Sequence, residues 1–124
     1  MSTTYYFSNL TKHQYINLIT FRKSGEGVGT PVWFAQDGNR LFVTTDASAG
    51  KAKRIRNNSR VELAPSDMRG KHLGDKVQAH ARILQGDEIK AAEKLLKKKY
   101  GLQYSMFGVA GRNTVRVFIE ITPP

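Results

Sequence analysis

Two segments late in the chain alternate apolar and polar residues with a period of two, and this pattern restricts the fold most strongly. Because successive side chains of a strand point to opposite faces, both segments are predicted to be half-buried antiparallel strands. In residues 76–84, "KVQAHARIL", the apolar positions are Val77, Ala79, Ala81 and Ile83. Residues 114–121, "TVRVFIEI", repeat the pattern at Val115, Val117, Ile119 and Ile121.

Four earlier segments extend the predicted sheet, and most of them are rich in β-branched and aromatic residues. Asp37-Gly38 is typical of a tight hairpin between the second and the third of them. The preceding glycines are spaced as GxGxG and lead into a strand, whereas a Rossmann fingerprint is GxGxxG and leads into a helix. A Rossmann fold is therefore excluded. The four segments are residues 15–23, 30–36, 40–45 and 60–64.

The helix pattern is strongest from Asp87 to Tyr100, where apolar residues follow helical spacing. Asp87 is expected to cap the start of this helix, and Gly101 is expected to end it. A short helix with one apolar stripe is predicted around Ala49, Ala52 and Ile55.

The start of the chain is expected to be an arm over residues 1–9, followed by a helical turn over residues 10–14 with Ser8 as its cap. Residues 105–113, "SMFGVAGRN", are expected to be a loop. These elements together predict a mainly β protein, a six-stranded antiparallel barrel with flanking helices. The 124 residues show no linker, so residues 1–124 are predicted to form a single domain.

The composition limits the partners of the chain. Twenty Lys and Arg residues oppose 10 Asp and Glu residues, which gives a net charge of +10 and attracts anions of any kind. The absence of cysteine excludes disulfides, thiol catalysis and cysteine metal sites. No signal segment or long apolar run is present, so a cytoplasmic protein without membrane contact is expected.

No motif identifies a catalytic residue. The histidines His13, His72 and His80 have no metal-ligand spacing, so no metal site is predicted. The chain has no G-x-S-x-G nucleophile elbow, and its carboxylates are scattered along the sequence. The sequence therefore does not indicate general acid-base catalysis by a pair of carboxylates.

The strongest candidate site lies in residues 44–63, "TTDASAGKAKRIRNNSRVEL". A Walker A loop would need Gly in place of Thr45 and Ser or Thr in place of Ala52, so a P-loop nucleotide site is excluded. A strand that ends before a helix nevertheless presents backbone N–H groups to an anion. A basic, solvated turn is the alternative interpretation. The residues that would hold a phosphate here are Thr44, Thr45, Ser48, Gly50 and Lys51.

A longer stretch carries a family resemblance. Residues 15–67, "YINLITFRKSGEGVGTPVWFAQDGNRLFVTTDASAGKAKRIRNNSRVELAPSD", resemble the core of the FMN-binding split-barrel family related to pyridoxamine 5′-phosphate oxidase. The branch that looks most similar is that of small deazaflavin (coenzyme F-420)-dependent oxidoreductases. The resemblance continues through "RGKHLGDKVQAHARIL" and the closing "RVFIEITP".

The resemblance implies a six-stranded split barrel that forms a homodimer, with one FMN or coenzyme F-420 in each of two interface grooves. Thr44 and Thr45 would meet the ribityl or phosphate end of the cofactor, Gly50 and Lys51 would hold its phosphate, and Lys53 would add a nearby charge. The flavin-type ring would lie against the strand formed by Thr30, Pro31, Val32, Trp33 and Phe34.

The chain departs from the family pattern at three points, and two of them argue against pyridoxamine-phosphate oxidase activity itself. Thr30 stands where flavin-phosphate oxidases commonly have Arg, and a longer C-terminal extension is lacking. Ser59 replaces a common Pro, which changes a loop and should preserve binding. The resemblance therefore predicts an oxidoreductase that transfers a hydride between its flavin-type cofactor and an unidentified small organic substrate.

Two other functions remain open. A cofactor carrier on the same barrel would bind without turnover. A basic nucleic-acid-binding module would use the positive run of residues 51–60 together with the cluster Lys97, Lys98 and Lys99. The chain lacks an RNP-type aromatic motif, so no specific nucleic acid is expected. The +10 charge mildly favours coenzyme F-420 over FMN, because the deazaflavin coenzyme has a tail of several carboxylates.

Overall fold

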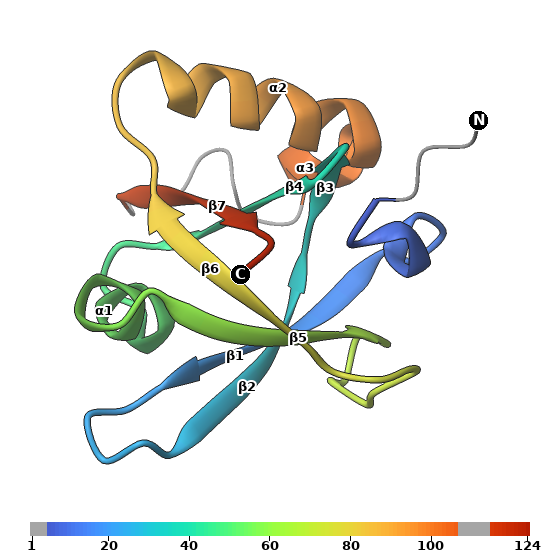
Figure 1. The fold of residues 1–124 in the computed structure, drawn as a ribbon. Coiled ribbons are helices and arrows are strands. Elements are labelled where there is room, and N and C mark those ends of the chain that lie inside the picture. The colour runs from blue at the N-terminus through green and yellow to red at the C-terminus, as the bar shows by residue number, and fades with distance from the viewer. Residues whose placement is uncertain (1–4, 107–114) are drawn as a thin grey trace.

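The computed structural model describes residues 5–106 and 115–124 and shows a mainly β chain with flanking helices, as the sequence predicts (Figure 1). One curled antiparallel sheet holds all the strands of the described residues. The elements in chain order are η1 Ser8–Leu10, β1 Tyr15–Phe21, β2 Gly27–Trp33, β3 Ala35–Asp37, β4 Arg40–Asp46, α1 Gly50–Asn57, β5 Arg60–Ser66, β6 Val77–Ile83, α2 Asp87–Tyr100, α3 Leu102–Met106 and β7 Arg116–Thr122.

The sheet has seven strands in the order β2-β1-β5-β6-β7-β4-β3, so the prediction of six strands is wrong by one. The predicted strand over residues 30–36 divides at Phe34 into β2 and β3, which lie at opposite ends of the strand order. β2 pairs with β1, whereas β3 pairs with β4. Since β2 and β3 are consecutive in the chain, Phe34 joins the two edges and the curled sheet becomes a split barrel.

The break at Phe34 is held by the side chain of Tyr100. The Phe34 amide donates a hydrogen bond to the Tyr100 hydroxyl at 2.9 Å, and this hydroxyl lies 2.8 Å from the Phe34 carbonyl oxygen. The hydroxyl also lies 2.6 Å from the carbonyl oxygen of Gln14. Buried backbone groups need partners, and the Tyr100 hydroxyl accepts from the Phe34 amide and donates its one proton to one of these two carbonyl oxygens.

The core lies on both sides of the sheet. The barrel interior is filled from six strands, η1 and α1, and it includes Leu18, Leu63 and Ile119. A second apolar cluster packs α2 and α3 against the outer face of β3, β4 and β7. The prediction that residues 114–121 have a single apolar face is therefore wrong. Phe118 is buried on the opposite face, in the second cluster. Val115, which precedes β7, is 76% exposed.

The described start of the chain is not an arm, in contrast to the prediction for residues 1–9. Phe7 and Leu10 are fully buried, and the Tyr6 amide bonds to the side chain of Asn39. The helical turn lies at Ser8–Leu10, earlier than expected, and Ser8 does not cap it. Residues 1–4 of the predicted arm lie outside the described residues.

The predicted helix 87–100 is confirmed, but its cap is not. The N-cap of α2 is Gly86, and no side chain caps it, so Asp87 is the first helical residue. Part of the predicted loop 105–113 belongs to α3, and its residues 107–113 lie outside the described residues. Among the residues that the structure describes, no helix is long and apolar enough to cross a membrane.

Candidate functional site

The residues predicted to hold a phosphate lie where β4 ends and α1 begins. Helix α1 starts at Gly50, and its buried residues Ala52 and Ile55 occupy the predicted apolar positions. Its N-cap is Ala49, which has no side-chain oxygen to accept from the first amides of the helix. The helix N-terminus therefore keeps amide donors without a side-chain cap, which is the arrangement that favours an anion.

Three cations and one carboxylate surround this junction: Lys51, Arg54, Arg116 and Asp46. The Arg116 guanidinium lies 3.3 Å from an Asp46 carboxylate oxygen and donates to the Thr44 hydroxyl at 3.3 Å. Arg116 and Asp46 face each other across the β4–β7 pair. We call Lys51, Arg54 and Arg116 the basic cluster.

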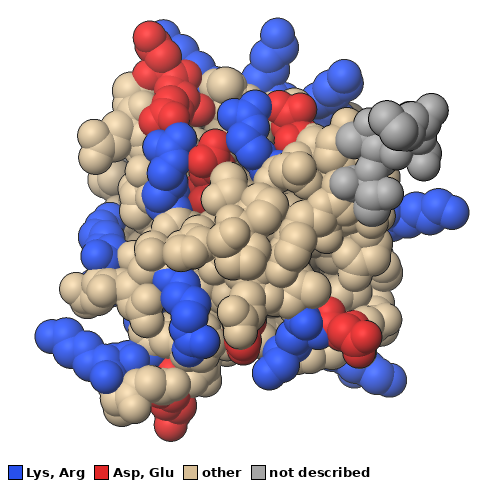
Figure 2. All heavy atoms as spheres, in the orientation of Figure 1, with Lys and Arg blue, Asp and Glu red and all other residues tan. Residues whose placement is uncertain are grey.

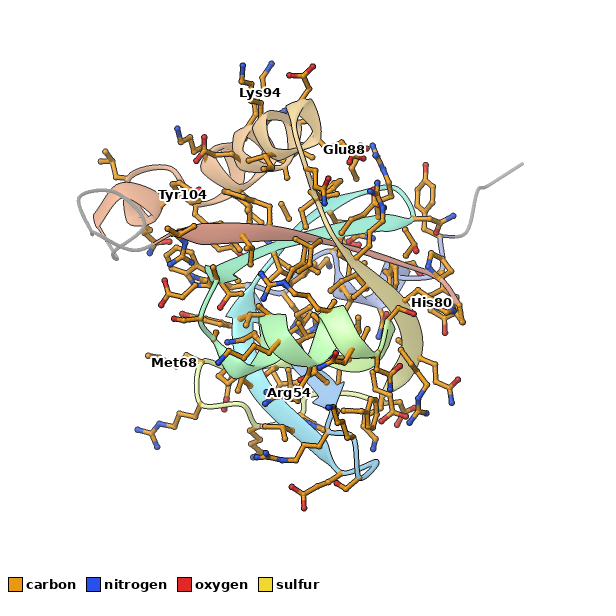
Figure 3. All side chains as sticks on the ribbon, turned by 90° about the vertical axis from the view of Figure 1, so that its left-hand side faces the viewer. Arg54, Met68, His80, Glu88, Lys94 and Tyr104 are labelled. Atoms are coloured by element: carbon orange, nitrogen blue, oxygen red, sulfur yellow. The ribbon has the colours of Figure 1, made fainter. Side chains whose placement is uncertain are left out.

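Arg54 is fixed in this cluster by a buried strand residue. Its guanidinium donates to the hydroxyl of Thr20, which is fully buried on β1, at 2.6 Å. Figure 3 shows the Arg54 side chain leaving α1 on the side of strands β1 and β2. A Cβ atom at Gly50 would lie 2.7 Å from the Arg54 guanidinium, so the absence of a side chain at Gly50 leaves room for that group.

Lys51 experiences the charge of the cluster directly. Burial lowers its pKa, and the nearby Arg54 and Arg116 lower it further, while Asp46 opposes the shift. The positive charge around Lys51 therefore exceeds what the single carboxylate balances. Guanidinium groups match phosphate oxygens geometrically, so the donors present here fit a phosphate group.

Of the other predicted phosphate ligands, only Thr44 contacts the basic cluster. Thr44 lies beside Arg116, but its hydroxyl also donates to the Val117 carbonyl oxygen at 3.0 Å. Thr45, on the opposite face of β4, is 7% exposed. Ser48 and Lys53 are not buried, and the described contacts do not bring either side chain into the basic cluster.

The predicted ring-binding residues form β2 and the break that follows it. Thr30 and Val32 pair with Leu18 and Ile16 of the core face, so Pro31 and Trp33 occupy the outer face. The Thr30 hydroxyl oxygen is buried without a hydrogen-bond partner among the described residues. Such a group offers one polar contact to a ligand at this strand.

Trp33 stacks on Tyr100, with ring centroids 4.3 Å apart and an interplanar angle of 8°. The Trp33 side chain is partly exposed and packs against the α2 cluster. It is therefore tied to the same phenol that holds the break at Phe34. A role of Trp33 toward substrate stays a prediction.

Sequence reasoning missed Arg54 and Arg116 as members of the site. Arg54 follows Gly50 by four residues, a spacing that places both on one face of a helix, so this signal was present. Arg116 occupies a polar position of the closing strand, and only the β4–β7 register brings it beside Thr44 and Asp46. Among the described residues, no group of His, Asp and Glu could hold a metal ion.

Comparison of the sequence with known protein families identifies one family that matches this chain. The sequence profile of the family described as pyridoxamine 5′-phosphate oxidase matches residues 6–123. No curated protein matches the chain in sequence.

Several solved structures share the fold. The heme storage protein HutZ from Vibrio cholerae has a TM-score of 0.72 at 14% identity, over 91% of this chain and 83% of that chain. A putative pyridoxamine 5′-phosphate oxidase from Listeria innocua has a TM-score of 0.66 at 20% identity, with 92% and 86% covered. An F-420 reductase has a TM-score of 0.62 at 21% identity, with 100% and 96% covered.

Proposed function

Because the chain belongs to the pyridoxamine 5′-phosphate oxidase family, we propose that it is a flavin- or deazaflavin-dependent oxidoreductase. The basic cluster at the start of α1 carries this proposal, because it offers several cations and uncapped helix amides to a phosphate. When bound, the flavin-type cofactor supplies the hydride chemistry. The chain's own residues would bind the cofactor, orient its ring and keep water from it.

The cofactor phosphate would be held by Lys51, Arg54 and the helix amides. Lys51 supplies an ammonium, and Arg54 supplies a guanidinium whose position Thr20 fixes. Arg116 is partly neutralised by Asp46, so it contributes mainly by holding Thr44 at the edge of the site. Phosphate binding here involves no phosphoryl transfer.

The ring of the cofactor would lie along the predicted residues Thr30–Phe34. Thr30 offers its unpartnered hydroxyl, and the Phe34 backbone is fixed by Tyr100. This strand therefore supplies a rigid wall that orients the ring and excludes water from one side. Coenzyme F-420 and FMN both meet these requirements.

The second subunit of the family arrangement is part of the proposal. A homodimer would complete the groove in which each cofactor lies. Sedimentation equilibrium of the purified protein tests this, and a monomer at all protein concentrations used for cofactor binding would refute the interface site.

Absorbance titration with FMN and with coenzyme F-420 tests the function. Wild-type protein should bind one of them saturably and transfer hydride to an acceptor. Lys51→Ala should weaken binding at least tenfold, or about 1.4 kcal/mol, because it removes a charge-assisted phosphate contact. Lys94→Ala removes the same charge from α2 and should leave the affinity unchanged. Equal affinities of all three proteins would remove Lys51 from the site.

A cofactor carrier is the second candidate, because one protein of the same fold is a heme storage protein. A carrier would bind its cofactor tightly but transfer no hydride to any acceptor in a broad panel. The nucleic-acid alternative gains no support from Figure 2, where Lys and Arg are spread over the visible face with acidic groups among them.

A further inference from the structure

A pocket separate from the basic cluster lies between the C-terminal half of α2, β3 and the segment after η1. Figure 1 shows the blue start of the described chain on the same side of the barrel as the C-terminal end of α2, away from α1, and Lys99 donates to the His13 carbonyl oxygen there. The pocket has a volume of about 410 Å³, which falls within the range of small-molecule sites. We call it the lysine pocket, and its lining residues are Thr11, Phe34, Ala35, Gln36, Leu95, Lys98 and Lys99.

One wall of the lysine pocket is apolar, and this wall is largely fixed. Phe34 and Ala35 are buried in the two core clusters, and Leu95 packs against the second. Gln36 donates hydrogen bonds to the carbonyl oxygens of Phe7 at 3.1 Å and Gly38 at 3.2 Å. The Phe34 backbone is held by a buried phenol of α2. A preformed apolar wall lowers the entropic cost of binding an apolar body.

Lys99 places a positive charge at this wall. Its ammonium nitrogen lies 3.5 Å from the ring centroid of Phe34 and donates to the His13 carbonyl oxygen at 2.9 Å. Burial lowers its pKa to about 8. The ammonium group is therefore partly removed from water although the residue as a whole remains exposed.

In the part of the chain that the structure describes, no carboxylate balances this charge. Lys97, on the same helical turn, lies 3.6 Å from Glu93, whereas no ion pair of Lys98 or Lys99 occurs among the described residues. Residues 1–4 and 107–114 contain no Asp or Glu in their sequence. A partly buried cation without a counter-ion is unfavourable, so an anion from outside the chain would stabilise it.

We propose that the lysine pocket binds a small organic acid, with its aromatic or other apolar body against Leu95 and its carboxylate at Lys98 and Lys99. Inorganic phosphate alone would leave the apolar wall empty, so the geometry favours an acid with an apolar body. This site shares no cation with the basic cluster, and it requires no bound flavin.

Isothermal titration of the full chain with 2-naphthoate at pH 7 tests the proposal, with 2-naphthalenemethanol as the neutral probe of similar shape. We expect saturable 2-naphthoate binding and at least tenfold weaker binding of the alcohol. Lys99→Met keeps the aliphatic stem and removes the charge, so it should weaken 2-naphthoate binding at least tenfold. Lys90→Met, on the exposed face of α2, should bind like wild type.

Leu95→Phe is a second variant that reduces the pocket volume and keeps both lysines. It should also weaken 2-naphthoate binding at least tenfold, with thermal melting used to show that each variant is folded. Equal binding of acid and alcohol, no effect of Lys99→Met in a folded protein, or no saturable binding would each overturn the proposal. Because the titration contains no flavin, its failure leaves the oxidoreductase proposal untouched.

Discussion

Replacing Tyr100 with Phe should destabilise the barrel more than the loss of one ordinary hydroxyl. The Tyr100 hydroxyl lies 2.9 Å from the Phe34 amide nitrogen, 2.8 Å from the Phe34 carbonyl oxygen and 2.6 Å from the Gln14 carbonyl oxygen. Phe34 is fully buried at the point where the chain stops pairing with β1 and starts pairing with β4. A neighbouring strand therefore cannot replace the lost bonds at this position.

The magnitude follows from the groups left behind. A buried backbone group without a partner costs about 1–3 kcal/mol, and the variant leaves the Phe34 amide in that state. The phenyl ring of the Tyr100→Phe variant would keep the stack on Trp33, so little packing energy is lost. We expect a loss of about 2 kcal/mol in the free energy of unfolding, or roughly 8 °C in Tm for a chain of this size.

Urea denaturation followed by circular dichroism measures the change, and Tyr104→Phe is the matched control. The Tyr104 hydroxyl bonds at 3.3 Å to a carboxylate oxygen of Glu93, whose partly exposed side chain water can solvate after the change. Tyr104→Phe should therefore cost less than about 1 kcal/mol. If both variants lose the same stability, the hydroxyl of Tyr100 does not hold the strand break.

Two further changes test the electrostatics. Glu120→Gln should lower the free energy of unfolding by about 1–2 kcal/mol, measured by urea denaturation. The Glu120 carboxylate is only 9% exposed and pairs with Arg82 at 2.9 Å and with Arg40 at 3.6 Å. The control Glu26→Gln breaks an exposed pair and should cost under about 0.5 kcal/mol. The lowered pKa of Lys99, about 8 against 10.5 when unfolded, means that the unfolded chain binds more protons between these pH values. Stability relative to Lys99→Met should therefore rise with pH across this window, and a constant difference in denaturation curves would contradict it.

The sequence could predict the features that depend on neighbouring residues. Asp37-Gly38 indicates the hairpin between β3 and β4, where Gly38 adopts a φ of +61° that other residues rarely adopt. The apolar spacing of Ala52 and Ile55 likewise predicts α1, and both residues are buried. Local chemistry determines these elements, so a single sequence suffices.

The missed features depend on residues far apart in the chain. The division of residues 30–36 at Phe34 relies on Tyr100, 66 residues later, and no local signal marks it. The alternating pattern predicts that Phe118 faces away from the barrel interior, on a solvent-exposed face. In the structure α2 covers that face and buries Phe118, which a period of two cannot reveal. Arg116 reaches the candidate site only through the register of β4 with β7. Tertiary contacts therefore explain why the predicted strand count and the predicted exposure of Phe118 were wrong, and why Arg116 was not predicted as a member of the site.

The ion pairs show where in the structure the excess positive charge of +10 lies. Several carboxylates of the described residues already pair with Arg or Lys, including Asp46, Glu93 and Glu120. Burial lowers the pKa of Lys51 at the start of α1 and of Lys99 at the end of α2. Folding therefore places partly desolvated cations at two separate positions, and each cation opposes folding until an anion balances it. An anion that binds the folded chain at either position must raise Tm, because it binds the native state and not the unfolded one.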